Sequence, residues 1–213
     1  MIDLYTWGTP NGQKVSIMLE ETGLSYSVHP VNITKGEQHR PDYLAINPNG
    51  KIPAIVDRDL EGGFAVFESG AILVYLAEKA EQLLPAAASD RAQVLSWLFW
   101  QVGGLGPMLG QWGHFSRSAP EKIPYAIDRY LTESLRLFSV LDQHLANREY
   151  IADDYSIADI ANYTWSVGGV KFMKGQHPDI EEQFPHLQQW IDRVGQRPAV
   201  IAGMQIPKLN PGS

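Results

Sequence analysis

Two short motifs carry backbone and side-chain groups suited to holding a small zwitterionic peptide. Pro53 stands where a buried strand should begin, a position that tolerates a residue with no ladder donor. If its peptide bond is cis, the N–H and C=O of Ile52 turn outward and can pair with an extended ligand. Glu68 and Ser69 precede an apolar helical run, where a helix terminus favours an anion and the carboxylate takes an ammonium group. Each motif alone fits an ordinary hairpin packed on a helix, whereas the pair favours a binding site.

A hairpin and a helix position these motifs. Residues 54–57 have the pattern of a short buried strand, and residues 64–67 that of the returning strand. The glycine-containing segment 59–63 between them supplies the turn. Ser69 is then expected to cap a helix in which apolar residues recur at helical spacing.

The segment before the hairpin supplies two further strands and two helices. Residues 2–5 and 26–31 read as strands, and residues 13–22 and 41–46 read as helices. The combined order, β-α-β-α-β-β-α, predicts an α+β, thioredoxin-like domain over residues 1–81.

Residues 82–88 form a linker rich in proline and alanine, and residues 89–213 form an all-helical domain with no repeat. The glycine-rich run 103–110 follows a helix, so we interpret it as a helix break that permits close backbone approach, not as a nucleotide loop. Ser156 and Asp159 have the spacing of a capping box, which gives Asp159 a role in folding and not in proton transfer.

Composition excludes several classes of partner. The 213 residues carry a net charge of −7 and no basic cluster, which argues against nucleic acid. A signal peptide and an apolar run long enough to cross a bilayer are both lacking, so we expect no membrane association and a cytoplasmic location by default.

The chain contains no cysteine, so any thiol chemistry must use a thiol that the ligand brings. The six histidines show no paired ligand spacing, and a Gly-x-Ser-x-Gly elbow is also missing. We therefore expect neither a metal site nor a hydrolase triad.

The two motifs resemble those of the glutathione transferase family. Lys51-Ile52-Pro53 matches the segment before the family's cis-proline, and Glu68-Ser69-Gly70 matches its segment for the γ-glutamyl group. The resemblance extends over nearly the whole chain. It implies a thioredoxin-like domain followed by an all-α domain, glutathione as co-substrate, and a homodimer in which the partner completes part of the cleft.

The loop Thr9-Pro10-Asn11, between the first strand and the first helix, resembles the nu-class branch of that family, which includes bacterial disulfide-bond oxidoreductases. In that branch the matching Thr and Asn contact the glutathione sulfur, so the resemblance implies catalytic roles for Thr9 and Asn11. A hydroxyl and an amide at a helix N-terminus favour a thiolate over a thiol. The alternative is that Thr9 or Asn11 only caps the helix.

The same resemblance implies that Gln38 and Arg129 bind glutathione, and Lys51 is a candidate for its glycine carboxylate. The alternatives are solvated loop side chains for Gln38 and Lys51 and a surface ion pair for Arg129.

Three functions follow. The first is a glutathione-dependent disulfide-bond oxidoreductase that uses a bound glutathione thiolate on small disulfides. The second is conjugation of glutathione to electrophiles by the same residues. The third is a non-catalytic glutathione-binding regulator that keeps the fold.

Overall fold

The structure is a computed structural model that describes residues 1–208, and its contacts divide the chain into two units. One unit comprises Met1–Leu84 together with the segment that begins at Gly195, and the other comprises Pro85–Val194. This grouping adds the C-terminal segment to the N-terminal unit, while the domain boundaries predicted from the sequence stay a prediction.

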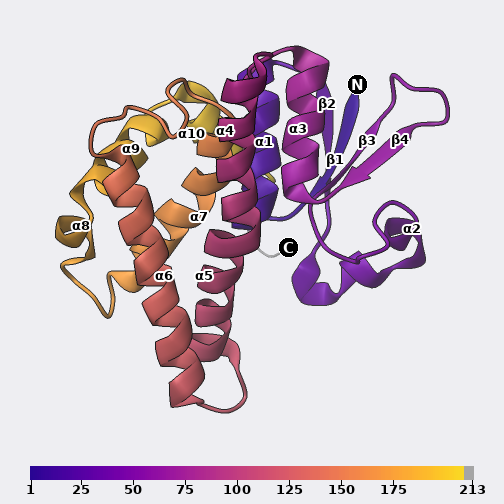
Figure 1. The fold of residues 1–213 in the computed structure, drawn as a ribbon. Coiled ribbons are helices and arrows are strands. Elements are labelled where there is room, and N and C mark those ends of the chain that lie inside the picture. Colours follow the sequence, from indigo (N-terminus) through magenta and orange to yellow (C-terminus); the bar gives the residue numbers. More distant parts are fainter. Residues whose placement is uncertain (209–213) are drawn as a thin grey trace. The chain divides into compact units, whose positions relative to one another are not determined.

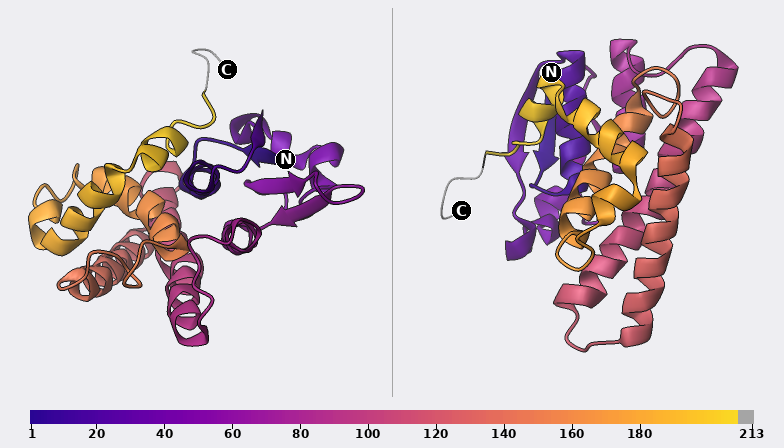
Figure 2. Two further views of the ribbon diagram at one scale, coloured as in Figure 1. Left: turned by 90° about the horizontal axis from the view of Figure 1, so that it is seen from above. Right: turned by 90° about the vertical axis from the view of Figure 1, so that its left-hand side faces the viewer.

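The first unit is built on a four-stranded sheet with the strand order β2-β1-β3-β4 (Figure 1). Strands β1 and β2 are parallel, whereas β1 pairs with β3 and β3 with β4 in antiparallel fashion. Helices α1 and α3 lie side by side on one face of this sheet (Figure 2). The arrangement confirms the predicted thioredoxin-like fold. The elements are β1 (Ile2–Thr6), α1 (Pro10–Thr22), β2 (Tyr26–Pro30), α2 (Pro41–Leu44), β3 (Ala54–Asp57), β4 (Phe64–Phe67), α3 (Ser69–Ala80) and α10 (Pro198–Gly203).

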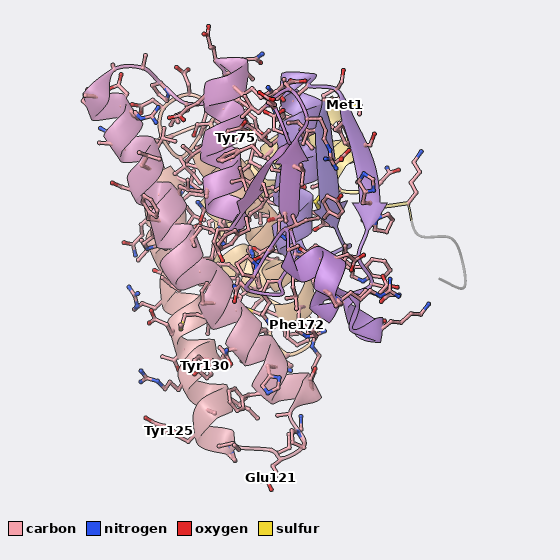
Figure 3. The ribbon with its side chains drawn as sticks, turned by 90° about the vertical axis from the view of Figure 1, so that its right-hand side faces the viewer. Met1, Tyr75, Glu121, Tyr125, Tyr130 and Phe172 are labelled. Carbon is pink, nitrogen blue, oxygen red and sulfur yellow. The ribbon has the colours of Figure 1, made fainter. Side chains whose placement is uncertain are left out.

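A buried carboxylate ties the hairpin to α3. Asp57, at the end of β3, is fully buried and accepts a hydrogen bond of 2.6 Å from the hydroxyl of Tyr75 on α3 (Tyr75 is labelled in Figure 3). The ammonium group of Lys79, one turn further along α3, lies 2.9 Å from the same carboxylate. Burial by itself raises the pKa of Asp57, but the bonds from Tyr75 and Lys79 lower it below its ordinary value.

Helix α10 packs on α1 at very short range. A Cβ atom on Gly203 would lie 2.6 Å from the backbone of Ile17, so only glycine allows this approach. The hydroxyl of Ser16 donates to the Gly203 carbonyl (2.8 Å), and the amide of Gln13 donates to the Met204 carbonyl (3.2 Å). Contacts that span almost the whole sequence therefore fix the helix that carries the Thr9 loop.

The second unit is helical, as predicted, and α5 and α6 run side by side in it (Figure 1). Its helices are α4 (Ala88–Trp100), α5 (Gly106–Gly113), α6 (Pro124–Leu145), α7 (Ile157–Met173), α8 (Ile180–Gln183) and α9 (Pro185–Gly195).

The glycine-rich run does not break the helix, so that interpretation was wrong. A π-helical turn, Gln101–Leu105, joins α4 directly to α5. The close approach that we expected is present, but it is made by a side chain. The indole of Trp165 lies 3.3 Å from where a Cβ of Gly106 would stand and 3.4 Å from that of Gly110.

The predicted capping box is confirmed at the start of α7. The buried Asp159 carboxylate accepts from the N–H of Ser156 (3.0 Å), the N–H of Ile151 (3.0 Å) and the indole N–H of Trp190 (2.9 Å). Burial raises the pKa of Asp159 to about 6, against the opposing effect of these hydrogen bonds. All its donors are structural, which agrees with a role in folding.

Two kinds of feature do not occur within residues 1–208. None of the helices combines the length and the apolar character that a membrane crossing needs. Likewise, the histidines, aspartates and glutamates of residues 1–208 form no group of three or more that could hold a metal ion.

Candidate functional site

The sheet topology brings the predicted site residues of the first unit to one edge. Strands β1 and β2 are parallel and both end there, and the antiparallel β3 begins there. Ala54 pairs with both Tyr5 and Phe67, so β4 also ends at this edge. The segments that flank these strand ends contain Thr9, Asn11, Gln38, Lys51, Ile52, Pro53, Glu68 and Ser69.

The Thr9 loop is fixed by its own cap and by a steric constraint. Thr9 is the N-cap of α1, and its hydroxyl oxygen accepts from the N–H of Gly12 (3.3 Å), so the capping role is confirmed. A Cβ on Gly12 would stand 2.3 Å from the Trp7 carbonyl oxygen and 2.4 Å from the Thr6 hydroxyl oxygen. Helix α1 therefore starts tightly against the end of β1.

The capping hydrogen bond leaves the O–H of Thr9 free to donate to a thiolate. A threonine hydroxyl that accepts one hydrogen bond keeps its own proton for donation. Asn11, half-buried, occupies the first turn of α1, which contains no acidic residue to offset the positive end of the helix dipole. The roles of Thr9 and Asn11 toward a sulfur stay a prediction.

Two side chains fix the backbone just before Pro53 by hydrogen bonds to one carbonyl group. The Ile52–Pro53 peptide bond is cis. The carbonyl of Lys51 accepts from the Tyr43 hydroxyl (2.5 Å) and from the Asn47 amide (2.6 Å). Burial raises the pKa of Tyr43 to about 12, so the hydroxyl remains a donor at neutral pH. Within residues 1–208 the N–H and C=O of Ile52 have no hydrogen-bond partner and are available for an extended ligand.

Gln38 is packed against the same loop. Gly50, with φ of 61°, lies so close that a Cβ there would stand 3.1 Å from the His39 ring and 3.4 Å from the Gln38 carbonyl oxygen. The Gln38 amide nitrogen lies 3.2 Å from the His39 ring nitrogen. Its amide oxygen is buried and finds no partner in the described part of the chain. This oxygen could therefore accept a hydrogen bond from a ligand.

The start of α3 differs in one detail from the expectation. Glu68, not Ser69, is the N-cap, and Ser69 is the first helical residue. Glu68 has φ of 69°, in the left-handed region that costs a non-glycine residue free energy and recurs at functional sites. Its carboxylate is exposed, whereas Ser69 is buried, and the first turn of α3 again holds no acidic residue.

One residue near this site was not predicted. Lys14, on α1, is only 1% exposed, and its ammonium nitrogen lies 3.2 Å from the Ser69 hydroxyl oxygen. Burial lowers the pKa of Lys14 to about 7, and the charge of Glu68 opposes that effect. Position 14 lies one turn before Met18 and borders the apolar face of α1, which was the available signal in the sequence.

Arg129 lies in the second unit, exposed on α6. The pKa of the neighbouring Glu133 is held below its ordinary value mainly by Arg136 and to a lesser degree by the charge of Arg129. A surface ion pair of Arg129 and its contact with a ligand both stay predictions.

Two protein-family models match the chain. The model of the glutathione S-transferase N-terminal domain matches residues 1–78, and that of the C-terminal domain matches residues 107–198. Among curated proteins, the disulfide-bond oxidoreductase YfcG of Escherichia coli is 49% identical over 93% of this chain and 92% of its own length. A second E. coli protein, disulfide-bond oxidoreductase YghU, is 42% identical over 98% of this chain and 76% of its own length.

Solved structures match over the whole fold. A glutathione transferase from Burkholderia graminis, crystallised with two glutathione molecules per subunit, has a TM-score of 0.93 and 43% identity, covering 98% of this chain and 89% of its own. A glutathione transferase from Pseudomonas putida with one glutathione disulfide per subunit has a TM-score of 0.92 and 44% identity, covering 97% and 91%.

Proposed function

This chain belongs to the glutathione transferase family, and from that premise we propose that it is a glutathione-dependent disulfide-bond oxidoreductase. The single observation that carries the proposal is that, within residues 1–208, the N–H and C=O of Ile52 and the amide oxygen of Gln38 find no partner at this edge, in a chain without cysteine. Two relatives that bear the name disulfide-bond oxidoreductase, at 49% and 42% identity, support it.

Glutathione is proposed to lie along this edge as an extended peptide. The backbone of Ile52 pairs with the cysteinyl unit, in the manner of an added strand. Glu68 takes the ammonium group of the γ-glutamyl unit, and Ser69 takes its carboxylate at the start of α3. Gln38 and Lys51 bind the remaining part of the peptide, with the Lys51 ammonium on the glycine carboxylate.

The sulfur of this ligand is proposed to lie beside the start of α1. There the hydroxyl of Thr9 and the amide of Asn11 donate to the sulfur, and the helix terminus favours its negative charge. A thiol placed at a helix N-terminus in a protein titrates at about 3.5–7.5 instead of about 8.5, and a bound glutathione thiol follows the same physics.

The reaction is thiol–disulfide exchange. The glutathione thiolate attacks one sulfur of a small disulfide, forms a mixed disulfide and releases one substrate thiolate. A second glutathione thiolate then attacks the glutathione sulfur of the mixed disulfide and releases the other substrate thiolate. Two glutathione thiols are oxidised to glutathione disulfide, and the substrate disulfide is reduced to two thiols.

The test is reduction of a small organic disulfide by glutathione, with glutathione reductase and NADPH reporting the rate. Asn11→Ala is expected to lower turnover about tenfold or more, because it removes a donor to the reacting charge. Thr9→Asp separates two roles of Thr9, since aspartate caps a helix well but repels a thiolate. This variant should fold normally and turn over slowly, while Thr9→Ser should keep most of the rate. Wild-type turnover at the uncatalysed background would refute the proposal.

Conjugation to electrophiles is the second candidate, because the same groups would activate the thiolate. Relatives crystallised with two glutathione molecules or one glutathione disulfide per subunit favour disulfide exchange, which needs room for two such units. A chain that binds glutathione in calorimetry but catalyses neither reaction would be a regulatory binding protein.

We also propose a nu-class homodimer in which Arg129 reaches the ligand. A monomer by sedimentation, or unchanged glutathione affinity in Arg129→Ala, would contradict the respective part. A cytoplasmic location is proposed because the reaction consumes reduced glutathione, which the cytosol maintains.

A further inference from the structure

The amine of Lys14 is buried directly beneath the first residue of α3. Its nitrogen lies 3.2 Å from the hydroxyl oxygen of Ser69, although the two residues are 55 positions apart in the sequence. A lysine side chain is almost never fully buried without a compensating interaction, because desolvation penalises its charged form. Burial accordingly lowers the pKa of this amine, which lies behind Ser69.

Three elements pack against the helix that carries this amine. Helix α1 packs against α3, β1 and α10, and α10 contains no titratable side chain. The charge of Glu68, the N-cap of α3, raises the pKa of Lys14. Asp3 is paired with Arg58, and Lys79 is paired with Asp57. The titratable side chains on these elements are Asp3, Tyr5, Tyr75, Glu78 and Lys79, and Glu68 is the N-cap of α3.

We propose that Lys14 is a positioning residue for the γ-glutamyl carboxylate of glutathione, holding the Ser69 hydroxyl and adding a positive charge beneath the start of α3. The inference rests on the proposed glutathione binding. Two positive contributions, the α3 terminus and the ammonium group, then act on one anion from the same side.

Binding should consequently be coupled to proton uptake. In the free protein Lys14 is close to half neutral at pH 7, since its pKa is lowered to about 7. The ligand carboxylate next to Ser69 favours the charged amine, while the ligand ammonium pairs with the exposed Glu68. If the bound amine stays charged, uptake is about half a proton at pH 7, about 0.9 at pH 8 and about 0.1 at pH 6.

The experiment measures this uptake in the wild-type protein. S-methylglutathione is titrated by calorimetry at pH 6, 7 and 8 in two buffers of different ionisation enthalpy. The methylated sulfur removes thiol titration from the signal, and the chain contributes no cysteine of its own. The expected result is an uptake that rises with pH together with an affinity that weakens above pH 7. Constant binding enthalpy in both buffers at all three pH values would overturn the inference.

Two variants assign the proton to this amine. Lys14→Met keeps the length of the side chain without its charge and should bind with no uptake and about tenfold weaker affinity at pH 6. Lys14→Arg keeps a permanent charge and should bind without uptake but with affinity that no longer depends on pH in this range. Lys35→Met, which removes an exposed lysine of the same unit, should behave as the wild type.

Kinetics and control outcomes separate this inference from the proposed function. Lys14→Met should raise KM for glutathione and leave kcat within about twofold, because the carboxylate is remote from the reacting sulfur. A wild-type protein that fails to bind S-methylglutathione refutes the proposed glutathione site. Binding with no proton exchange, or uptake that persists in Lys14→Met, overturns only the role of Lys14.

Discussion

Gly12→Ala tests whether the tight start of α1 sets the activity. A Cβ at position 12 would stand 2.3 Å from the Trp7 carbonyl oxygen and 2.4 Å from the Thr6 hydroxyl oxygen. Ordinary contact distances begin at about 3.4 Å, so the loop and the first turn of α1 must separate by about 1 Å. A displacement of this size in a reacting geometry costs about 100-fold in rate.

The expected result is a kcat/KM for disulfide reduction that falls about 100-fold, together with an unfolding free energy lowered by about 1–3 kcal/mol through overpacking. The assays are the glutathione-reductase-coupled rate and urea denaturation. Gly168→Ala is the matched control, because a Cβ there meets no atom within 4 Å on an exposed position of α7. It should keep the full rate and gain about 0.5–1 kcal/mol. Wild-type rate and stability in Gly12→Ala would contradict the steric constraint at the start of α1.

Three further changes test the framework of the fold. Gly203→Ala should lower the unfolding free energy by about 1–3 kcal/mol in urea, because its Cβ would meet the Ile17 backbone at 2.6 Å; no loss would contradict the packing of α10. Asp159→Asn should cost about 2–4 kcal/mol in the same assay, since an amide cannot accept every hydrogen bond of the carboxylate; a neutral result would contradict the capping network. Tyr75→Phe should cost about 1–2 kcal/mol at pH 7, and this difference should shrink as pH falls below about 4, where the lowered pKa of Asp57 no longer favours folding; a pH-independent difference would contradict the pairing.

Local chemistry made the hairpin and its motifs predictable. The bounds of β3 and β4 agree with the expectation because a short apolar run and a glycine-containing turn are encoded within a few residues. The cis bond at Pro53 follows from the resemblance to the family, whereas the position of the proline indicates only that it is tolerated at the start of a strand. The order of elements, and with it the fold, followed from such signals.

Contacts between distant segments were not predictable in the same way. Ser69 was expected to cap α3, but its hydroxyl interacts with Lys14, and only the packed fold shows which lysine lies within reach. The glycine-rich run was interpreted as a break, whereas its glycines accommodate the indole of Trp165 from another helix. The packing of Gly203 on Ile17 likewise depends on segments that the sequence separates widely.

The most direct test of the central claim is the pKa of the glutathione thiol in the bound state. Thiolate absorption in the ultraviolet, measured as the difference from the protein alone, reports it with no contribution from a protein thiolate, because the chain has no cysteine. Saturating protein is expected to lower this pKa from about 8.5 to below about 7.5, and Asn11→Ala or Thr9→Asp is expected to move it back toward the free value. A bound thiol that titrates as it does in free solution would contradict the claim that the start of α1 activates a ligand-borne thiolate.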